Sequence, residues 1–209
     1  MSPRPIEFPA AGLSDGLVRV RLIADADIPA VTAACDDPEI ARYTTIPTPY
    51  ATRHAREWLR QAHRGVESGT DLQTVVAAEA GGEVVGSVGL SGIDPATARC
   101  AAGYWVAAGA RGRGVATRAL LLLCRYGFDQ LGLERIEAWI DPGNSASLHV
   151  AERVGFSREG LLRSFMPING VRRDMLMYSL LPGELSPPAA GASLGPPPLQ
   201  GSDRASGAR

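Results

Sequence analysis

The first half of the chain contains two different spacings of hydrophobic residues. In segment 17–23 apolar residues alternate with arginines, which predicts a half-buried strand. In segments 28–35 and 55–66 apolar residues recur at helical spacing, which predicts two amphipathic helices. The first helix is expected to end at the turn formers of residues 36–38, and Thr52 is expected to cap the second.

The second half continues with short apolar segments separated by glycine and proline turns. Segments 72–79 and 83–90 flank two consecutive glycines, a direct signal for a hairpin. Segment 114–131 is apolar on nearly all sides, which predicts a helix buried against a sheet. The other expected elements are strands over 99–106 and 135–140, a helix over 145–154, and a terminal hairpin of 156–165 and 172–181.

These elements define one folded domain over residues 17–182. Residues 1–16 are rich in Pro, Ala and Gly, and we expect them to form a flexible segment. Beyond residue 182 the composition shifts to Pro, Gly, Ala and Ser, so residues 183–209 are expected to be a disordered tail. The strand, glycine loop, helix and strand between residues 99 and 140 predict a right-handed crossover unit.

The run from Arg111 to Thr117, with the sequence RGRGVAT, separates a strand from the buried helix. Closely spaced glycines let the backbone turn tightly and approach a ligand, and a helix that starts there points free N–H groups at an anion. Three interpretations compete at this point: a phosphate loop for a nucleotide-bearing cofactor, an arginine-glycine patch for nucleic acid, and a plain turn before a helix.

Composition and charge narrow these alternatives. The chain has 209 residues, a net charge of −1 and a pI near 6.3, which disfavours a nucleic-acid partner. No secretory signal and no apolar stretch long enough to span a membrane are recognised, so a cytoplasmic protein without a membrane segment is expected. Cys35, Cys100 and Cys124 are far apart and lack metal-ligand spacing, so we expect free thiols and no metal.

Several motifs occur in a fixed order along the chain. They are Gly103-Tyr104-Trp105-Val106, then Arg111 with Gly114 and Ala116, Asn144 with Ser147, Gly155-Phe156, Glu159-Gly160, and Asp174 with Tyr178-Ser179-Leu180. With the order of elements, they resemble the GNAT superfamily of N-acetyltransferases, and within it the RimJ/RimL type that acetylates ribosomal proteins. The resemblance implies an α/β (α+β) acyl-CoA N-acyltransferase fold, with a mixed, mostly antiparallel central sheet and helices on both faces.

The same resemblance implies acetyl-CoA as cosubstrate and places its binding residues. The pantetheine arm is expected along the end of the strand at 99–106, and the pyrophosphate on the backbone amides of the glycine run. The N–H of Val106 is the candidate for polarising the acetyl carbonyl. The implied cofactor-binding residues are Trp105, Val106, Ala107, Arg111, Gly112, Arg113, Gly114, Val115, Ala116, Thr117, Asn144 and Ser147.

The catalytic candidates are Ser147 and Glu137. In RimJ/RimL-like enzymes the position of Ser147 is suited to protonating the leaving thiolate, whereas a plain role within its helix is the alternative. Asn144 has helix capping as its alternative. Glu137 is a candidate base, either directly or through water, because Ala101 stands where many relatives carry a glutamate. A solvated or ion-paired glutamate and water-mediated deprotonation are the alternatives for Glu137.

The resulting expectation is an N-acetyltransferase that transfers acetyl to a primary amine by direct attack in a ternary complex. The amine is either a protein N-terminus, which the RimJ/RimL resemblance favours, or a small molecule. A catalytically weak acyl-CoA-binding regulatory module is the first rival, and an RNA-associated protein is the second. The terminal hairpin could also support a homodimer.

Overall fold

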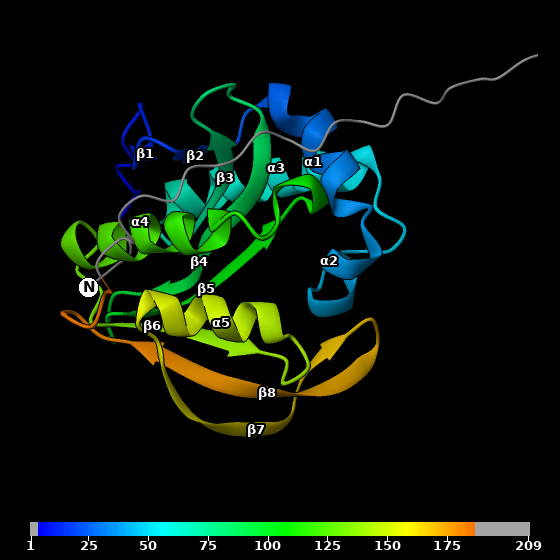
Figure 1. Ribbon diagram of the computed structural model, residues 1–209. Coiled ribbons are helices and arrows are strands. Elements are labelled where there is room, and N and C mark those ends of the chain that lie inside the picture. Colours follow the sequence, from blue (N-terminus) through cyan, green and yellow to red (C-terminus); the bar gives the residue numbers. More distant parts are fainter. Residues whose placement is uncertain (1–3, 187–209) are drawn as a thin grey trace, which may run out of the picture.

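The computed structural model describes residues 4–186 and forms one mixed sheet with helices on both faces (Figure 1). The strands follow the order β1-β2-β3-β4-β5-β6-β8-β7, and among these pairs only β5 and β6 are parallel. The expected mixed, mostly antiparallel sheet is confirmed. The strands are β1 Leu13–Ser14, β2 Val18–Leu22, β3 Asp71–Ala78, β4 Val84–Asp94, β5 Arg99–Val106, β6 Arg135–Ile140, β7 Ser157–Ile168 and β8 Val171–Leu180.

The helices form one layer on each face of the sheet. Helices α4 and α5 cover one face, while α1 and α3 cover the other (Figure 1). Each face has its own core: Val76, Leu90 and Leu120 belong to the first, and Val31 and Val75 to the second. The helices are α1 Ile28–Cys35, α2 Pro38–Tyr43, α3 Thr52–Ser68, α4 Val115–Asp129 and α5 Ser145–Val154, and the two short 3-10 turns are η1 Asp25–Asp27 and η2 Ala108–Ala110.

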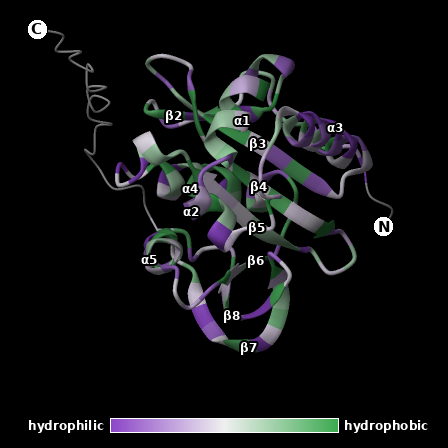
Figure 2. Cartoon of the chain, turned by 90° about the vertical axis from the view of Figure 1, so that its right-hand side faces the viewer, coloured by the Kyte–Doolittle hydropathy of each residue, from purple (hydrophilic) through white to green (hydrophobic). Residues whose placement is uncertain are grey.

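Helix α3 shows why a single apolar stripe is enough to hold a helix on the sheet. Its buried positions include Ala55, Leu59 and Ala62, which recur at helical spacing. Its other residues are mostly polar or charged, so the helix is largely hydrophilic in colour in Figure 2. The expected cap is wrong: Thr52 is the first helical residue, and the backbone N–H of Ala51 donates to Nδ1 of His54 at 3.1 Å.

Two further expectations need correction. Residues 36–38 were expected only as a turn that ends the first helix, but they also begin a second one. The carboxylate of Asp37 accepts from the N–H of Glu39 and thereby caps the short helix α2. Within the expected flexible segment 1–16, Ile6 is buried and the ring of Phe8 lies edge-on to Tyr126. The N-terminal residues from position 6 therefore pack against the domain.

The chain still packs against the domain at the last described residue. The N–H of Ser186 donates to the carbonyl of Val154 at 2.9 Å, so the chain packs on the end of α5 just beyond β8. Most of the expected disordered tail, from residue 187 onward, lies outside the described residues. Within the described part of the chain, no helix has the length and apolar character needed to cross a membrane.

Candidate active site

The sheet opens between its two parallel strands. β5 and β6 pair only over Arg99–Ala101 and Arg135–Glu137. Beyond this register β5 continues beside β4 as far as Val106, and β6 continues beside β8 as far as Ile140. The facing edges of β5 and β6 therefore carry backbone groups that pair with no neighbouring strand at the carboxyl end of the two strands.

The backbone of Val106 faces this opening. Ala107 donates its N–H to the carbonyl of Val85 at 2.9 Å, so the ladder to β4 is made by alternate residues, Ala107 and Trp105 among them. The polar backbone groups of Val106 then point the other way, to the side from which β6 has diverged. The N–H of Ala107, expected to bind the cofactor arm, is used inside the sheet and does not face the opening.

A cavity of about 640 Å³ lies beside this opening on the face covered by α4 and α5, and we call it the α4-side cavity. It is formed by α2, the end of β5, the glycine loop and the start of α5. The structure leaves Ala107, Arg113 and Glu137 out of its lining. The expected site residues that line it are Trp105, Val106, Arg111, Gly112, Gly114, Val115, Ala116, Thr117, Asn144 and Ser147.

The glycine loop has the geometry of an anion-binding loop. Gly112 and Gly114 adopt φ of +73° and +75°, a region that favours glycine, and Gly114 is the N-cap of α4. A Cβ at either glycine would meet no protein atom within 4 Å, so both positions border open space. The N-terminal amides of a helix of 15 residues thus face the α4-side cavity, where they favour a negatively charged group.

Arg111 links the glycine loop to its neighbouring elements by hydrogen bonds. Its Nε donates to the carbonyl of Val106 at 3.1 Å, and its Nη2 donates to Oδ2 of Asp37 at 2.6 Å. Asp37 is the cap of α2, so one guanidinium joins the loop, the end of β5 and α2. The carbonyl of Val106 is consequently held while its N–H stays directed at the opening.

Helix α5 presents Asn144 and Ser147 to the same cavity. Oδ1 of Asn144 accepts from the N–H of Ser147 at 3.1 Å, so Asn144 has the capping role that was its alternative interpretation. Among the described residues no hydrogen bond engages the hydroxyl of Ser147. Tyr104 donates its hydroxyl to the carbonyl of Ser147 at 3.2 Å. Burial raises the pKa of Tyr104 to about 12, so its phenol remains protonated at neutral pH.

Glu137 lies at the paired end of β5 and β6, opposite Ala101. Its Oε1 accepts from Nε of Arg135 at 2.9 Å and lies 3.9 Å from a guanidinium nitrogen of Arg99. Its carboxylate is therefore neutralised by arginines and is not brought to the α4-side cavity.

The sequence reasoning missed several other residues of the cavity. Glu39 and Tyr43 reach it from α2, and His149 reaches it from α5. Tyr43 also donates its hydroxyl to the carbonyl of Gly143 at 3.2 Å, which ties α2 to the loop before α5. The sequence did carry a signal for α2, because Asp followed by Pro and Glu is a typical helix start.

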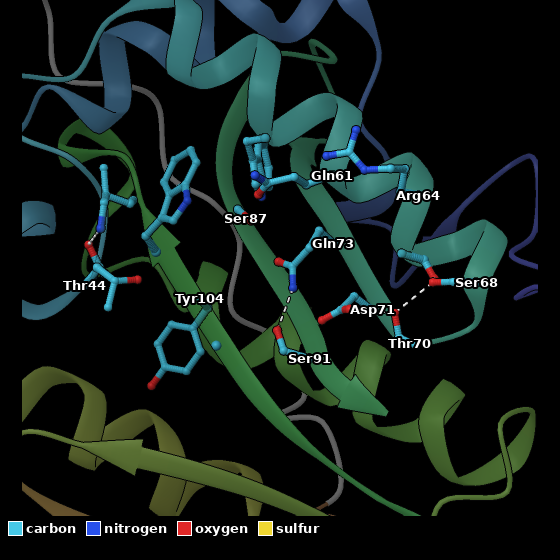
Figure 3. A pocket seen from close by; sticks show the side chains of 16 residues that line it. Thr44, Gln61, Arg64, Ser68, Thr70, Asp71, Gln73, Ser87, Ser91 and Tyr104 are labelled. Carbon is cyan, nitrogen blue, oxygen red and sulfur yellow. Dashed lines mark hydrogen bonds between the residues drawn. The ribbon is translucent and has the colours of Figure 1, made fainter. Parts of the chain in front are cut away.

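A second cavity, also of about 640 Å³, lies on the opposite face of the sheet beside α3, and we call it the α3-side cavity (Figure 3). Thr44, Tyr104 and Trp105 line both cavities. Tyr104 packs with the core under α4, whereas Trp105 packs with the core under α3, as alternation along a strand requires. The two cavities therefore approach each other at the end of β5.

Comparison with known proteins agrees with this architecture. Residues 18–157 match the family model described as the acetyltransferase (GNAT) domain. The uncharacterized N-acetyltransferase p20 of Bacillus licheniformis is 32% identical over 164 residues, which cover 78% of this chain and 90% of p20. The putative ribosomal N-acetyltransferase YdaF of Bacillus subtilis is 36% identical over 103 residues, covering 49% of this chain and 56% of YdaF.

Among solved structures, RimJ of Mycobacterium smegmatis, in complex with CoA-disulfide, superimposes with a TM-score of 0.73 and 28% identity. The match covers 83% of this chain and 86% of RimJ. The chain belongs to the GNAT acetyltransferase family, and it is an acetyl-CoA-dependent N-acetyltransferase whose acceptor is an amine.

Proposed function

We propose that this enzyme acetylates either the N-terminal α-amine of a protein or a small-molecule amine, by direct attack on acetyl-CoA in a ternary complex. Acetyl-CoA would occupy the α4-side cavity, and the amine would enter through the α3-side cavity. The single observation that carries this proposal is that cavities on opposite faces of the sheet share Thr44, Tyr104 and Trp105 beside the opening between β5 and β6. A thioester and an amine can meet there from opposite sides.

The proposed cofactor contacts follow from the backbone. The amides of residues 111–117 would bind the pyrophosphate, because the helix dipole and unpaired N–H groups favour an anion there. The N–H of Val106 would donate to the acetyl carbonyl oxygen and stabilise the negative charge that develops as the amine attacks. Asn144 would contact the pantetheine arm with its amide nitrogen, because its oxygen is already used in the cap.

For proton transfer we propose Ser147 as the group that donates to the departing thiolate. Its hydroxyl lines the α4-side cavity, and Tyr104 and Asn144 hold its backbone on both sides. Glu137 is not retained as the base, because Arg135 and Arg99 hold its carboxylate away from the cavity. The amine would instead lose its proton to solvent before attack.

The names of the relatives support a protein N-terminus as the acceptor, since YdaF is called a putative ribosomal N-acetyltransferase and RimJ shares the fold. We also propose a cytoplasmic location, which is in keeping with three cysteines that are all free and buried. Exposed Leu161, Phe165 and Val171 on the β7–β8 hairpin could support the homodimer.

The test is a screen of small amines and short peptides with free N-termini, followed by thiol release from acetyl-CoA and by the mass of the product. The proposal predicts stoichiometric thiol release and a product heavier by one acetyl group on a primary amine. Thiol release that does not depend on any amine, or acetylation confined to hydroxyl groups, would contradict it.

A further inference from the structure

The floor of the α3-side cavity is built from polar and very small residues of three strands. Asp71 on β3 pairs in register with Ser91 on β4, and Gln73 pairs with Gly89. Gly89 in turn pairs with Gly103 on β5. A Cβ at Gly89 would collide with the amide of Gln73, so glycine is what allows that side chain to lie across β4. A Cβ at Gly103 would meet nothing within 4 Å, so the floor is open there.

Hydroxyl and amide side chains line this cavity together with Arg64, and Asp71 supplies the one carboxylate among its lining residues (Figure 3). The Asp71 carboxylate accepts from the hydroxyl of Thr70 at 2.8 Å and from the N–H of Gly92 at 3.2 Å, which leaves lone pairs on both oxygens. Gln73 donates through Nε2 to Ser91 Oγ at 2.8 Å, so its carbonyl oxygen remains as an acceptor. An acceptor-rich cavity with one carboxylate favours a cationic donor.

Two further observations favour a cation. The indoles of Trp58 and Trp105 both line the cavity, and aromatic faces attract an ammonium group. Arg64 also lines it, but its Nη2 donates to Oε1 of Glu57 at 3.1 Å on the exposed surface of α3. Glu57 also pairs with Arg60, so it offsets only part of the charge of Arg64 at the rim, while Asp71 forms no ion pair within the described residues.

We infer that the α3-side cavity binds a second cationic group of the acceptor substrate, at Asp71, Gln73 and Ser91; this rests on the function proposed above. Asp71 on β3 pairs with Ser91 on β4, and Ser91 pairs with Ala101 on β5. Ala101 precedes Trp105 by four residues. The two positions are therefore about 13 Å apart along the strands and about 10 Å across them. After side chains and the acetyl-bearing arm extend toward each other, the reacting nitrogen and the second cation lie on the order of 10 Å apart. A long diamine and a short peptide with a basic side chain both carry a reactive amine and a second cationic group at about this distance.

The test compares matched acceptors with and without the second charge. One pair is diaminooctane and octylamine, and the other is the peptides Ala-Ala-Lys and Ala-Ala-norleucine. We expect kcat/KM for the dicationic member to exceed that of its partner by about ten- to a hundredfold, as for a charge-assisted hydrogen bond. The pair that shows this ratio identifies the source of the cation, and calorimetry on the CoA-loaded enzyme measures the same preference as a ratio of Kd.

Two variants test whether Asp71 and Gln73 cause the preference for the dicationic acceptor. Asp71→Asn keeps the shape of the side chain: its Oδ1 still accepts from the N–H of Gly92, and its amide nitrogen donates to the hydroxyl oxygen of Thr70. This variant is expected to bring the ratio close to one. Gln73→Met is expected to lower the ratio independently, and Asp94→Asn, at the C-terminal end of β4 and outside the lining of the cavity, is the control that retains it.

Equal kcat/KM within both pairs, or a ratio unchanged in Asp71→Asn and Gln73→Met, would overturn the inference. If no amine is acetylated at all, the proposed function fails, while the Kd ratio still decides whether the cavity holds a cation.

Discussion

Ser147 is the residue whose side chain the structure leaves available for chemistry. Its N–H and carbonyl are fixed by Asn144 and Tyr104, and the residue lines the α4-side cavity. Because the pKa of Tyr104 is about 12, that phenol is a hydrogen-bond donor rather than a base. In the proposed mechanism, Tyr104 positions Ser147 and Ser147 donates the proton, although the two residues lie 43 positions apart in the chain.

Ser147→Ala is predicted to lower kcat by about a hundredfold, at the low end of the range for general acid catalysis. The Kd for acetyl-CoA is expected to change little, because backbone amides are the proposed cofactor contacts. Steady-state kinetics and calorimetry check the two halves of the prediction. Ser157→Ala, at the start of β7 and outside the cavity, is the control; a Ser147→Ala enzyme with native kcat would remove the hydroxyl from the mechanism.

Some residue roles could be predicted from sequence and others could not. Ser147 and Asn144 stand in a motif with short spacing, so their shared helix start was visible. The hydrogen bond of Tyr104 depends on how α5 packs on β5, and the ion pairs of Glu137 depend on the β5–β6 register. Such contacts arise between distant segments, and no local pattern encodes them.

At the scale of elements, the glycine loop and α4 together form the proposed anion site. Gly114 takes a left-handed conformation and starts α4, so loop geometry and helix dipole converge on one point. Arg111 ties the loop to α2, an element that was overlooked because residues 36–38 were interpreted only as the end of α1. Short helices with few residues give little periodicity, and their caps are then the best signal.

Gly114→Val is predicted to weaken acetyl-CoA binding by more than about tenfold, or ~1.4 kcal/mol, because its side chain would occupy the approach to the helix N-terminus. Gly132→Val is a matched control. Gly132 has φ of +65° and open space around a Cβ, but it lies beyond the other end of α4. Calorimetric titration with acetyl-CoA should separate the two variants, and equal affinity in both would refute the loop as the binding site.

At the scale of the whole molecule, function follows from a sheet that separates two cavities and opens between β5 and β6. Residues 99–106 and 135–140 were predicted as strands with their exact bounds, and the crossover between them was also expected. The family resemblance implied that the strand at 99–106 is splayed at its end, but no local pattern predicted divergence after three paired residues, because strand pairing is decided by packing across the sheet. The packed N-terminal residues escaped prediction for a similar reason, since Ile6 and Phe8 find their partners only in the folded domain.

The central claim is that acetyl-CoA and the amine occupy these two cavities at the same time. Initial rates measured while both substrates are varied test it most directly. Simultaneous occupancy predicts double-reciprocal lines that intersect, and no acetylated enzyme in the mass spectrum after incubation with acetyl-CoA alone. Parallel lines together with a stable acetyl-enzyme would indicate a covalent, ping-pong route and would contradict the account.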